Sequence, residues 1–134
     1  MTTRLGIVGL VVADREASLA FYRHLGAEFG TAAPDGHIEA ILPGGLRLAI
    51  DTEEIIRSFH PGWQFPHGGS RISLGYQCES PADVDAVYER LVAAGYHGEL
   101  EPFDAVWGDR WATVHDPDGN GIDLYASLSN KPAE

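Results

Sequence analysis

Polar and apolar positions alternate on both sides of a turn in the segment 107–125. Successive side chains of a β-strand point to opposite faces of the sheet, so the alternation predicts a β-hairpin with two unlike faces. The intervening Asp-Pro-Asp-Gly-Asn sequence favours a type I turn with Pro117 at its first corner and φ > 0 at Gly119 or Asn120. One face is small and apolar, with Ala112, Val114, Ile122 and Leu124. A functional site is expected on the other, polar and aromatic face, which carries Trp111, Thr113, His115, Asp123 and Tyr125.

The first third of the chain predicts a strand, a helix and three further strands. Residues 5–12 are apolar throughout, which predicts a strand covered on both faces. Asp14 is a typical N-cap, and Gly26 stands where a helix often ends in a left-handed residue. A strand is predicted near 27–31, and a hairpin is predicted from 37–42 and 46–51 around Pro43-Gly44-Gly45. The apolar positions at helical spacing are Ala17, Ala20, Phe21 and Leu25.

The same order returns in the second half. Residues 71–78 predict a strand, Ser80 an N-cap with Asp83 as its capping-box partner, and Gly95 the end of a helix. A strand at 99–103 leads into the hairpin. The two N-caps lie 66 positions apart and the two glycines 69, which indicates two copies of one βαβββ module. The apolar stripe predicted for the second helix consists of Val84, Val87, Tyr88, Leu91 and Val92.

These modules occupy residues 1–51 and 71–128 of a single predicted domain, 1–134, and residues 52–70 connect them. Prolines, glycines and aromatic residues crowd the connector, so regular structure is not expected over most of it. Its start, 53–59, predicts a helical turn.

Charge and composition narrow the expected partners and location. The net charge is −11 at pH 7. Nucleic acids and anionic membranes require basic surfaces, so we expect neither as a partner, whereas neutral or cationic small molecules fit. The single cysteine, Cys78, cannot form an internal disulfide and suits a reducing compartment. With no signal peptide and no apolar run of about 18 residues, the sequence predicts a cytoplasmic protein.

Short matches to one known family occur in order along the chain. They are Val12-Ala13-Asp14, Ser18, Phe21-Tyr22 and Leu25-Gly26 in the first module, and Trp107-Gly108, Arg110, residues 116–120 and Ile122-Asp123-Leu124 in the second. Together they resemble the vicinal oxygen chelate superfamily of glyoxalases, extradiol dioxygenases, and fosfomycin- and bleomycin-resistance proteins. The resemblance implies an α+β fold in which two βαβββ modules form a U-shaped, partly open mixed β-barrel with helices outside. It also implies a ligand cavity inside the barrel, and a homodimer.

The resemblance further implies where a metal would bind. Metal-dependent members hold the ion with His or Gln on the first strand and Glu on the last strand of each module. Internal register assigns these positions to Ile7, Arg47, Ser73 and Asp123, and a slip to Asp51 or Arg71 completes no ligand set. A divalent cation usually needs at least three N or O donors, whereas here only Asp123 is a good one and Arg47 would repel the ion. We therefore expect no metal and no other cofactor.

The remaining candidates form an aromatic ligand site. By strand parity, Trp107, Trp111 and Thr113 point into the cavity that the resemblance implies, and the connector residues Trp63 and Phe65 are expected to fold over it. The alternative places the two strand tryptophans in the core or in a dimer interface. Arg47 and Asp123 either pair across the cavity, bind opposite ends of a polar ligand, or are both solvated. The predicted ligand-binding residues are Arg47, Trp63, Phe65, Trp107, Trp111, Thr113, Asp123 and Tyr125.

Two functions fit this pattern. The first is a metal-free protein, similar to the bleomycin-resistance branch and so to antibiotic resistance, that binds or sequesters a small molecule. Aromatic walls suit a flat or hydrophobic ligand, and an acidic protein with indole faces also suits a cationic one. The alternative is a metal-dependent glyoxalase-type lyase or isomerase, or a dioxygenase, using Ni, Zn, Mn or Fe. The sequence favours the binding protein over the enzyme, and no residue is assigned a catalytic role.

Overall fold

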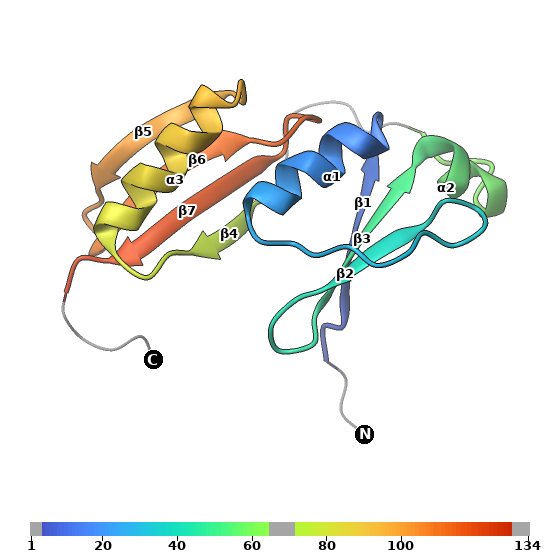
Figure 1. Ribbon diagram of the computed structural model, residues 1–134, viewed down its shortest axis with the longest axis horizontal. Coiled ribbons are helices and arrows are strands. Elements are labelled where there is room, and N and C mark those ends of the chain that lie inside the picture. Colours follow the sequence, from blue (N-terminus) through green and yellow to red (C-terminus); the bar gives the residue numbers. More distant parts are fainter. Residues whose placement is uncertain (1–3, 65–71, 130–134) are drawn as a thin grey trace. The chain divides into compact units, whose positions relative to one another are not determined.

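The computed structural model describes residues 4–64 and 72–129. The chain divides into two compact units, Met1–His67 and Gly68–Glu134 (Figure 1). Within the described residues there are three helices and seven strands in two mixed sheets, so the predicted α+β class is confirmed. No helix in this described part is both long enough and apolar enough to cross a membrane.

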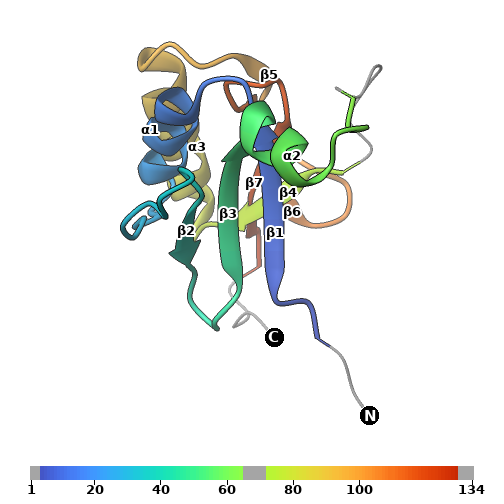
Figure 2. The same cartoon turned by 90° about the vertical axis from the view of Figure 1, so that its right-hand side faces the viewer.

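The first unit contains a three-stranded sheet in the order β1-β3-β2. Strand β1 runs parallel to β3, and β2 runs antiparallel to it (Figure 2). The 37–42 and 46–51 hairpin is therefore confirmed, and the helical turn predicted at 53–59 is a seven-residue helix. The elements are β1 (Ile7–Val12), α1 (Arg15–His24), β2 (Ile38–Ile41), β3 (Arg47–Thr52) and α2 (Glu53–Phe59).

Helix α1 begins and ends where the sequence predicts. The Asp14 carboxylate accepts a hydrogen bond from the Ala17 backbone N–H at 3.1 Å, and Gly26 has φ +93°. Its buried face differs from the predicted stripe, because Ala20 is exposed whereas Leu19 is 2% exposed. The buried apolar residues that α1 and the sheet contribute are Val12, Leu19, Phe21, Tyr22, Ile38, Ala40, Leu48, Ala49 and Ile50.

Two predictions for the first unit are wrong. Residues 27–31 form no regular strand: the segment makes a single bridge to β2, Phe29 to Ala40, and the Gly30 N–H donates to the Glu39 carbonyl at 3.0 Å. Strand β1 is an edge strand, and it is not covered on both faces: Ile7 is 40% exposed and Gly9 is exposed. Its apolar composition reflects burial of one face only.

The second unit contains a four-stranded sheet in the order β4-β7-β6-β5. As in the first unit, its first and last strands run parallel, so both copies of the module pair these strands in the same way, and only the first copy lacks one strand. Strand β4 covers only the middle of the predicted 71–78 segment. The elements are β4 (Leu74–Gln77), α3 (Pro81–Ala93), β5 (Gly98–Asp104), β6 (Asp109–His115) and β7 (Gly121–Ser127).

Helix α3 covers the apolar face of this sheet. Its N-cap, Ser80, accepts a hydrogen bond from the Asp83 N–H at 3.2 Å, and Gly95 has φ +101°, as predicted. Val84 and Leu91 are fully buried, but Val92 is 41% exposed and falls outside the predicted stripe. The Arg110 guanidinium ties the helix to the sheet by donating to both Asp85 oxygens, at 2.9 and 3.2 Å, and to Asp104 at 3.0 Å.

The predicted β6–β7 hairpin is confirmed residue by residue. Trp111 pairs with Tyr125 and Thr113 with Asp123, while all four residues predicted for the apolar face, Ala112, Val114, Ile122 and Leu124, are fully buried. The turn has the expected type I hydrogen bond, from the Gly119 N–H to the Asp116 carbonyl at 3.0 Å, and Gly119 has φ +83°.

The buried Asp116 carboxylate organises this turn. Its Oδ1 accepts hydrogen bonds from the backbone N–H groups of Asp118 and Asn120, at 3.0 and 2.8 Å, and its Oδ2 accepts from the Asn120 side-chain amide at 2.8 Å. The carboxylate therefore fixes three donors in a loop of five residues.

A network of charged side chains lies on the face of the first sheet that carries Glu39 and Arg47, called here the open face. His37 Nδ1 is 2.5 Å from Asp51 Oδ1, its Nε2 is 2.7 Å from Glu39 Oε2, and Arg47 donates to Glu39 Oε1 at 3.1 Å. Imidazole donates from both nitrogens only when it is protonated. The hydrogen bonds to Glu39 and Asp51 accordingly raise the pKa of His37, and the one to His37 lowers the pKa of Glu39.

Replacing Asp116 with alanine should destabilise the protein by about 1–3 kcal/mol, because backbone donors of the turn lose their acceptor. Asp116→Asn keeps an acceptor and should cost less. Urea unfolding followed by circular dichroism measures both. Glu101→Ala is the control, since it removes an exposed carboxylate from the same unit. A cost for Asp116→Ala no larger than that of Glu101→Ala would contradict the role of the carboxylate.

The His37 network should make stability depend on pH. The pKa of His37 is higher in the folded protein than in the unfolded chain, where it is about 6.5. Protonated His37 therefore stabilises the fold fully at pH values below about 6.5, and this contribution is lost as pH rises through the folded pKa. The gap in unfolding free energy between the parent and His37→Gln should therefore shrink from pH 6 to pH 9 in urea titrations. His60→Gln, at an exposed histidine of the same unit, serves as the control. A gap that stays constant or widens with pH would refute this assignment.

Candidate functional site

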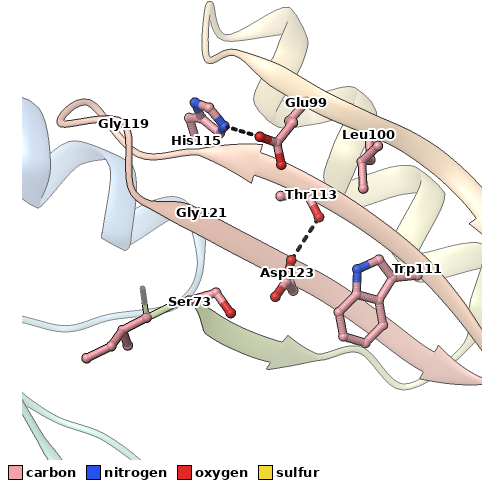
Figure 3. A pocket seen from close by; sticks show the side chains of 10 residues that line it. Ser73, Glu99, Leu100, Trp111, Thr113, His115, Gly119, Gly121 and Asp123 are labelled. Carbon is pink, nitrogen blue, oxygen red and sulfur yellow. Dashed lines mark hydrogen bonds and ion pairs between the residues drawn. The ribbon is translucent and has the colours of Figure 1, made fainter. Parts of the chain in front are cut away.

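A pocket of about 510 Å³ lies on the polar and aromatic face of the second sheet (Figure 3). Every residue that lines it belongs to the second unit. Strands β6 and β7 form its floor, β5 contributes one wall, and the residues just before β4 contribute another. The lining residues are Ile72, Ser73, Glu99, Leu100, Trp111, Thr113, His115, Gly119, Gly121 and Asp123.

Thr113 and Asp123 are hydrogen-bonded neighbours on the floor. They stand opposite each other in the β6–β7 register, and the Thr113 hydroxyl donates to Asp123 Oδ1 at 2.8 Å. Thr113 is 4% exposed, so this bond holds the carboxylate in one position. The second oxygen, Oδ2, accepts no hydrogen bond from the residues that the structure describes. It remains available to a ligand.

Trp111 forms an aromatic wall of the pocket and is held by its own neighbours. Its ring stacks on Tyr125, with centroids 5.6 Å apart and an interplanar angle of 28°. Trp107 makes an edge contact with it at 5.3 Å and 84°, and Phe103 contacts Trp107 in the same way at 6.3 Å. Contacts from two neighbouring rings restrain the indole, so it is positioned before any ligand arrives.

The opposite rim carries an imidazole and a carboxylate. His115 Nε2 lies 3.1 Å from Glu99 Oε1, and the His97 ring meets His115 edge-on with centroids 4.8 Å apart. Both side chains of this pair are partly exposed. Together with Asp123, Glu99 gives the pocket two carboxylates, which favour a ligand with positive charge or with N–H donors.

Glu99 and Leu100 were missed by the sequence argument for a structural reason. Gly98 pairs with Val114 but Leu100 pairs with Thr113, so β5 carries a bulge between them. A bulge interrupts the alternation of faces. As a result two consecutive residues line the pocket, which parity counting cannot predict.

The structure brings together five of the eight predicted ligand-binding residues. Trp111, Thr113 and Asp123 line the pocket, and Tyr125 and Trp107 contact Trp111 behind it. Trp107 does so from the turn before β6 and not from a strand, so the parity argument was wrong for it. It is 59% exposed, not buried in a core.

The other three predicted residues are not part of this pocket. Arg47, in the first unit, donates to Glu39 at 3.1 Å and is exposed. Trp63, also in the first unit, lies under the Arg57 guanidinium at 5.2 Å. Phe65 lies outside the described residues. Arg47 and Asp123 thus each have a partner within their own unit, Glu39 and Thr113.

The four positions that the resemblance assigns to a metal are Ile7, Arg47, Ser73 and Asp123. Ile7 pairs with Arg47 in the first sheet, and Ser73 and Asp123 both line the pocket. Only Asp123 among the four is a good metal donor, so these residues do not fit a divalent ion. Nor does the described part of the chain hold any other group of three His, Cys, Asp or Glu side chains suited to a metal.

Comparison with known proteins agrees with this architecture. Residues 4–124 match the family model "Glyoxalase/Bleomycin resistance protein/Dioxygenase superfamily". A structure described as a glyoxalase/bleomycin resistance protein/dioxygenase from Nocardioides is 28% identical, with a TM-score of 0.79 over 100% of this chain and 90% of that one.

Two more distant structures share the fold. A family enzyme from Burkholderia phytofirmans PsJN has a TM-score of 0.83 at 19% identity, covering 94% of this chain and 100% of that one. A fosfomycin resistance protein from Listeria monocytogenes has a TM-score of 0.73 at 21% identity, covering 95% of each. Among curated proteins, none matches. The repeated module, the strand pairing and the family match lead to one conclusion: the chain belongs to the glyoxalase/bleomycin resistance protein/dioxygenase superfamily.

Proposed function

We propose that this protein binds a small, flat aromatic molecule in the pocket of the second unit, that it prefers a cationic one, and that it does so without a metal. The main observation behind the proposal is that two groups lie on one surface of the pocket. One is the Trp111 indole, which neighbouring rings restrain, and the other is the Asp123 carboxylate, whose Oδ2 accepts no hydrogen bond from the described residues. An aromatic wall with a few oriented polar groups is typical of small-molecule sites.

Electrostatics support the preference for a cation. Asp123 and Glu99 both line the pocket, and the chain carries a net charge of −11. An indole attracts a cation placed near its face, and a desolvated carboxylate strengthens that attraction. His115 is the one basic side chain among the lining residues, and it is engaged by Glu99.

A metal-dependent enzyme of the same superfamily is the second candidate. Asp123 favours it, because it stands at the expected last-strand ligand position and keeps one oxygen available. Against it, the other three positions that the resemblance assigns carry Ile7, Arg47 and Ser73, which do not complete a ligand set. Sequestration, as a route to antibiotic resistance, needs only binding and is the function we favour. A homodimer and a cytoplasmic location remain predictions.

The binding proposal predicts saturable quenching of tryptophan fluorescence by N-methylquinolinium in buffer containing EDTA. The neutral ring of the same shape, 1-methylnaphthalene, should bind more weakly. Trp111→Ala should weaken binding of the cation about 2- to 30-fold, because cation–π and stacking contacts contribute about 0.5–2 kcal/mol.

Trp63→Phe is the matched control, since it alters a tryptophan of the other unit. Asp123→Asn should reduce the advantage of the cation over the neutral ring. Binding that begins only after Ni, Mn or Zn is added would reject the metal-free proposal and favour the enzyme.

A further inference from the structure

The edge of Trp111 that faces the pocket carries its hydrogen-bond donor. Tyr125 stacks on one face of the indole. Figure 3 shows the indole nitrogen on the side of the ring that faces Asp123 and Thr113. Nε1–H donates to no residue in the described part of the chain, and Trp111 is only partly buried. The pocket therefore offers a neutral N–H donor as well as an aromatic surface.

The neighbouring acceptor is equally well defined. Thr113 uses its only hydroxyl hydrogen on Asp123 Oδ1, so Thr113 has none left to donate to a ligand. Asp123 Oδ2 can accept but cannot donate while the carboxylate is ionised. One side of the pocket thus presents a donor, from Trp111, next to an acceptor, from Asp123 (Figure 3).

We propose that this pair selects ligands in which an N–H donor stands directly beside a hydrogen-bond acceptor on the rim of an aromatic ring. Aryl carboxamides and lactams fused to an aromatic ring are the simplest members of this class. The amide N–H would donate to Asp123 Oδ2, and the carbonyl oxygen would accept from Trp111 Nε1–H. The inference rests on the proposed function and specifies the chemistry of the ligand for that site.

The energetic reason is the cost of leaving either group without a partner. A typical hydrogen bond contributes a net two- to tenfold in affinity, and an unpaired polar group that loses water on binding adds a penalty. An ester of the same shape satisfies the indole but leaves the carboxylate unpaired. A carboxamide satisfies both groups, so it should be preferred over the ester although neither is charged.

Three compounds on one ring system test this. Naphthalene-2-carboxamide has donor and acceptor, methyl naphthalene-2-carboxylate has the acceptor alone, and naphthalen-2-ylmethylammonium has donors alone. Chemical-shift titrations of ¹⁵N-labelled protein give each dissociation constant. The indole N–H signal of Trp111, assigned as the one missing in Trp111→Phe, should move with the carboxamide.

In the parent protein the carboxamide should bind about three- to tenfold more tightly than the ester. Trp111→Phe keeps an aromatic ring but removes the donor, so it should weaken the carboxamide and the ester by similar factors and the ammonium compound less. Asp123→Asn should weaken the ammonium compound most. Trp107→Phe is the control, because Trp107 contacts Trp111 but does not line the pocket.

Equal affinity for carboxamide and ester, or a Trp111→Phe variant that binds the carboxamide as tightly as the parent does, would overturn this inference while the proposed function stands. If none of the three naphthalenes binds, nor N-methylquinolinium, the proposed function fails as well. A loss of affinity for the carboxamide in Trp107→Phe but not in Trp111→Phe would also overturn it, because the donor would then be Trp107.

Discussion

The register of the β6–β7 hairpin is the constraint on which the rest of the site depends. Side chains alternate with a period of two, so a slip of one residue would turn Thr113 and Asp123 into the core and expose the apolar face. The turn prevents this slip. Asp116 holds three donors of the loop, and Gly119 accepts the positive φ that closes it. The contact between Thr113 and Asp123 on the floor of the pocket depends on this register of β6 and β7.

Those parts of the fold that local chemistry determines were predictable from the sequence. The caps at Asp14 and Ser80 and the two faces of the hairpin are set by side chains within a few positions of each other. The bulge at Glu99 was not predictable, because it arises from how β5 meets β6. The same holds for the pairing of Gly75 with Asp123, because it joins parallel strands that lie far apart in the sequence.

The two copies of the module share their buried face and differ on their open face. Both place apolar residues between sheet and helix, because each sheet must cover one face to be stable. On the open side, the first copy sets Arg47 between Ile7 and Ile41 and holds His37 between two carboxylates. The second copy has an indole, a threonine and an aspartate there. The two modules therefore share a fold but carry different side chains, with different chemistry, on their open faces.

The bond from Thr113 to Asp123 does not by itself decide between an organic ligand and a metal. Carboxylates that bind metals are often held by a second hydrogen bond of this kind. What separates the two is the number of donors that converge. A metal needs at least two more N or O donors beside Asp123, and the other three positions that the resemblance assigns, Ile7, Arg47 and Ser73, do not complete such a set. An organic ligand needs only shape, one acceptor and one donor, and Trp111 with Asp123 provides these on a single face. This difference in the number of donors is the reason that the proposed function favours an organic ligand over a metal ion.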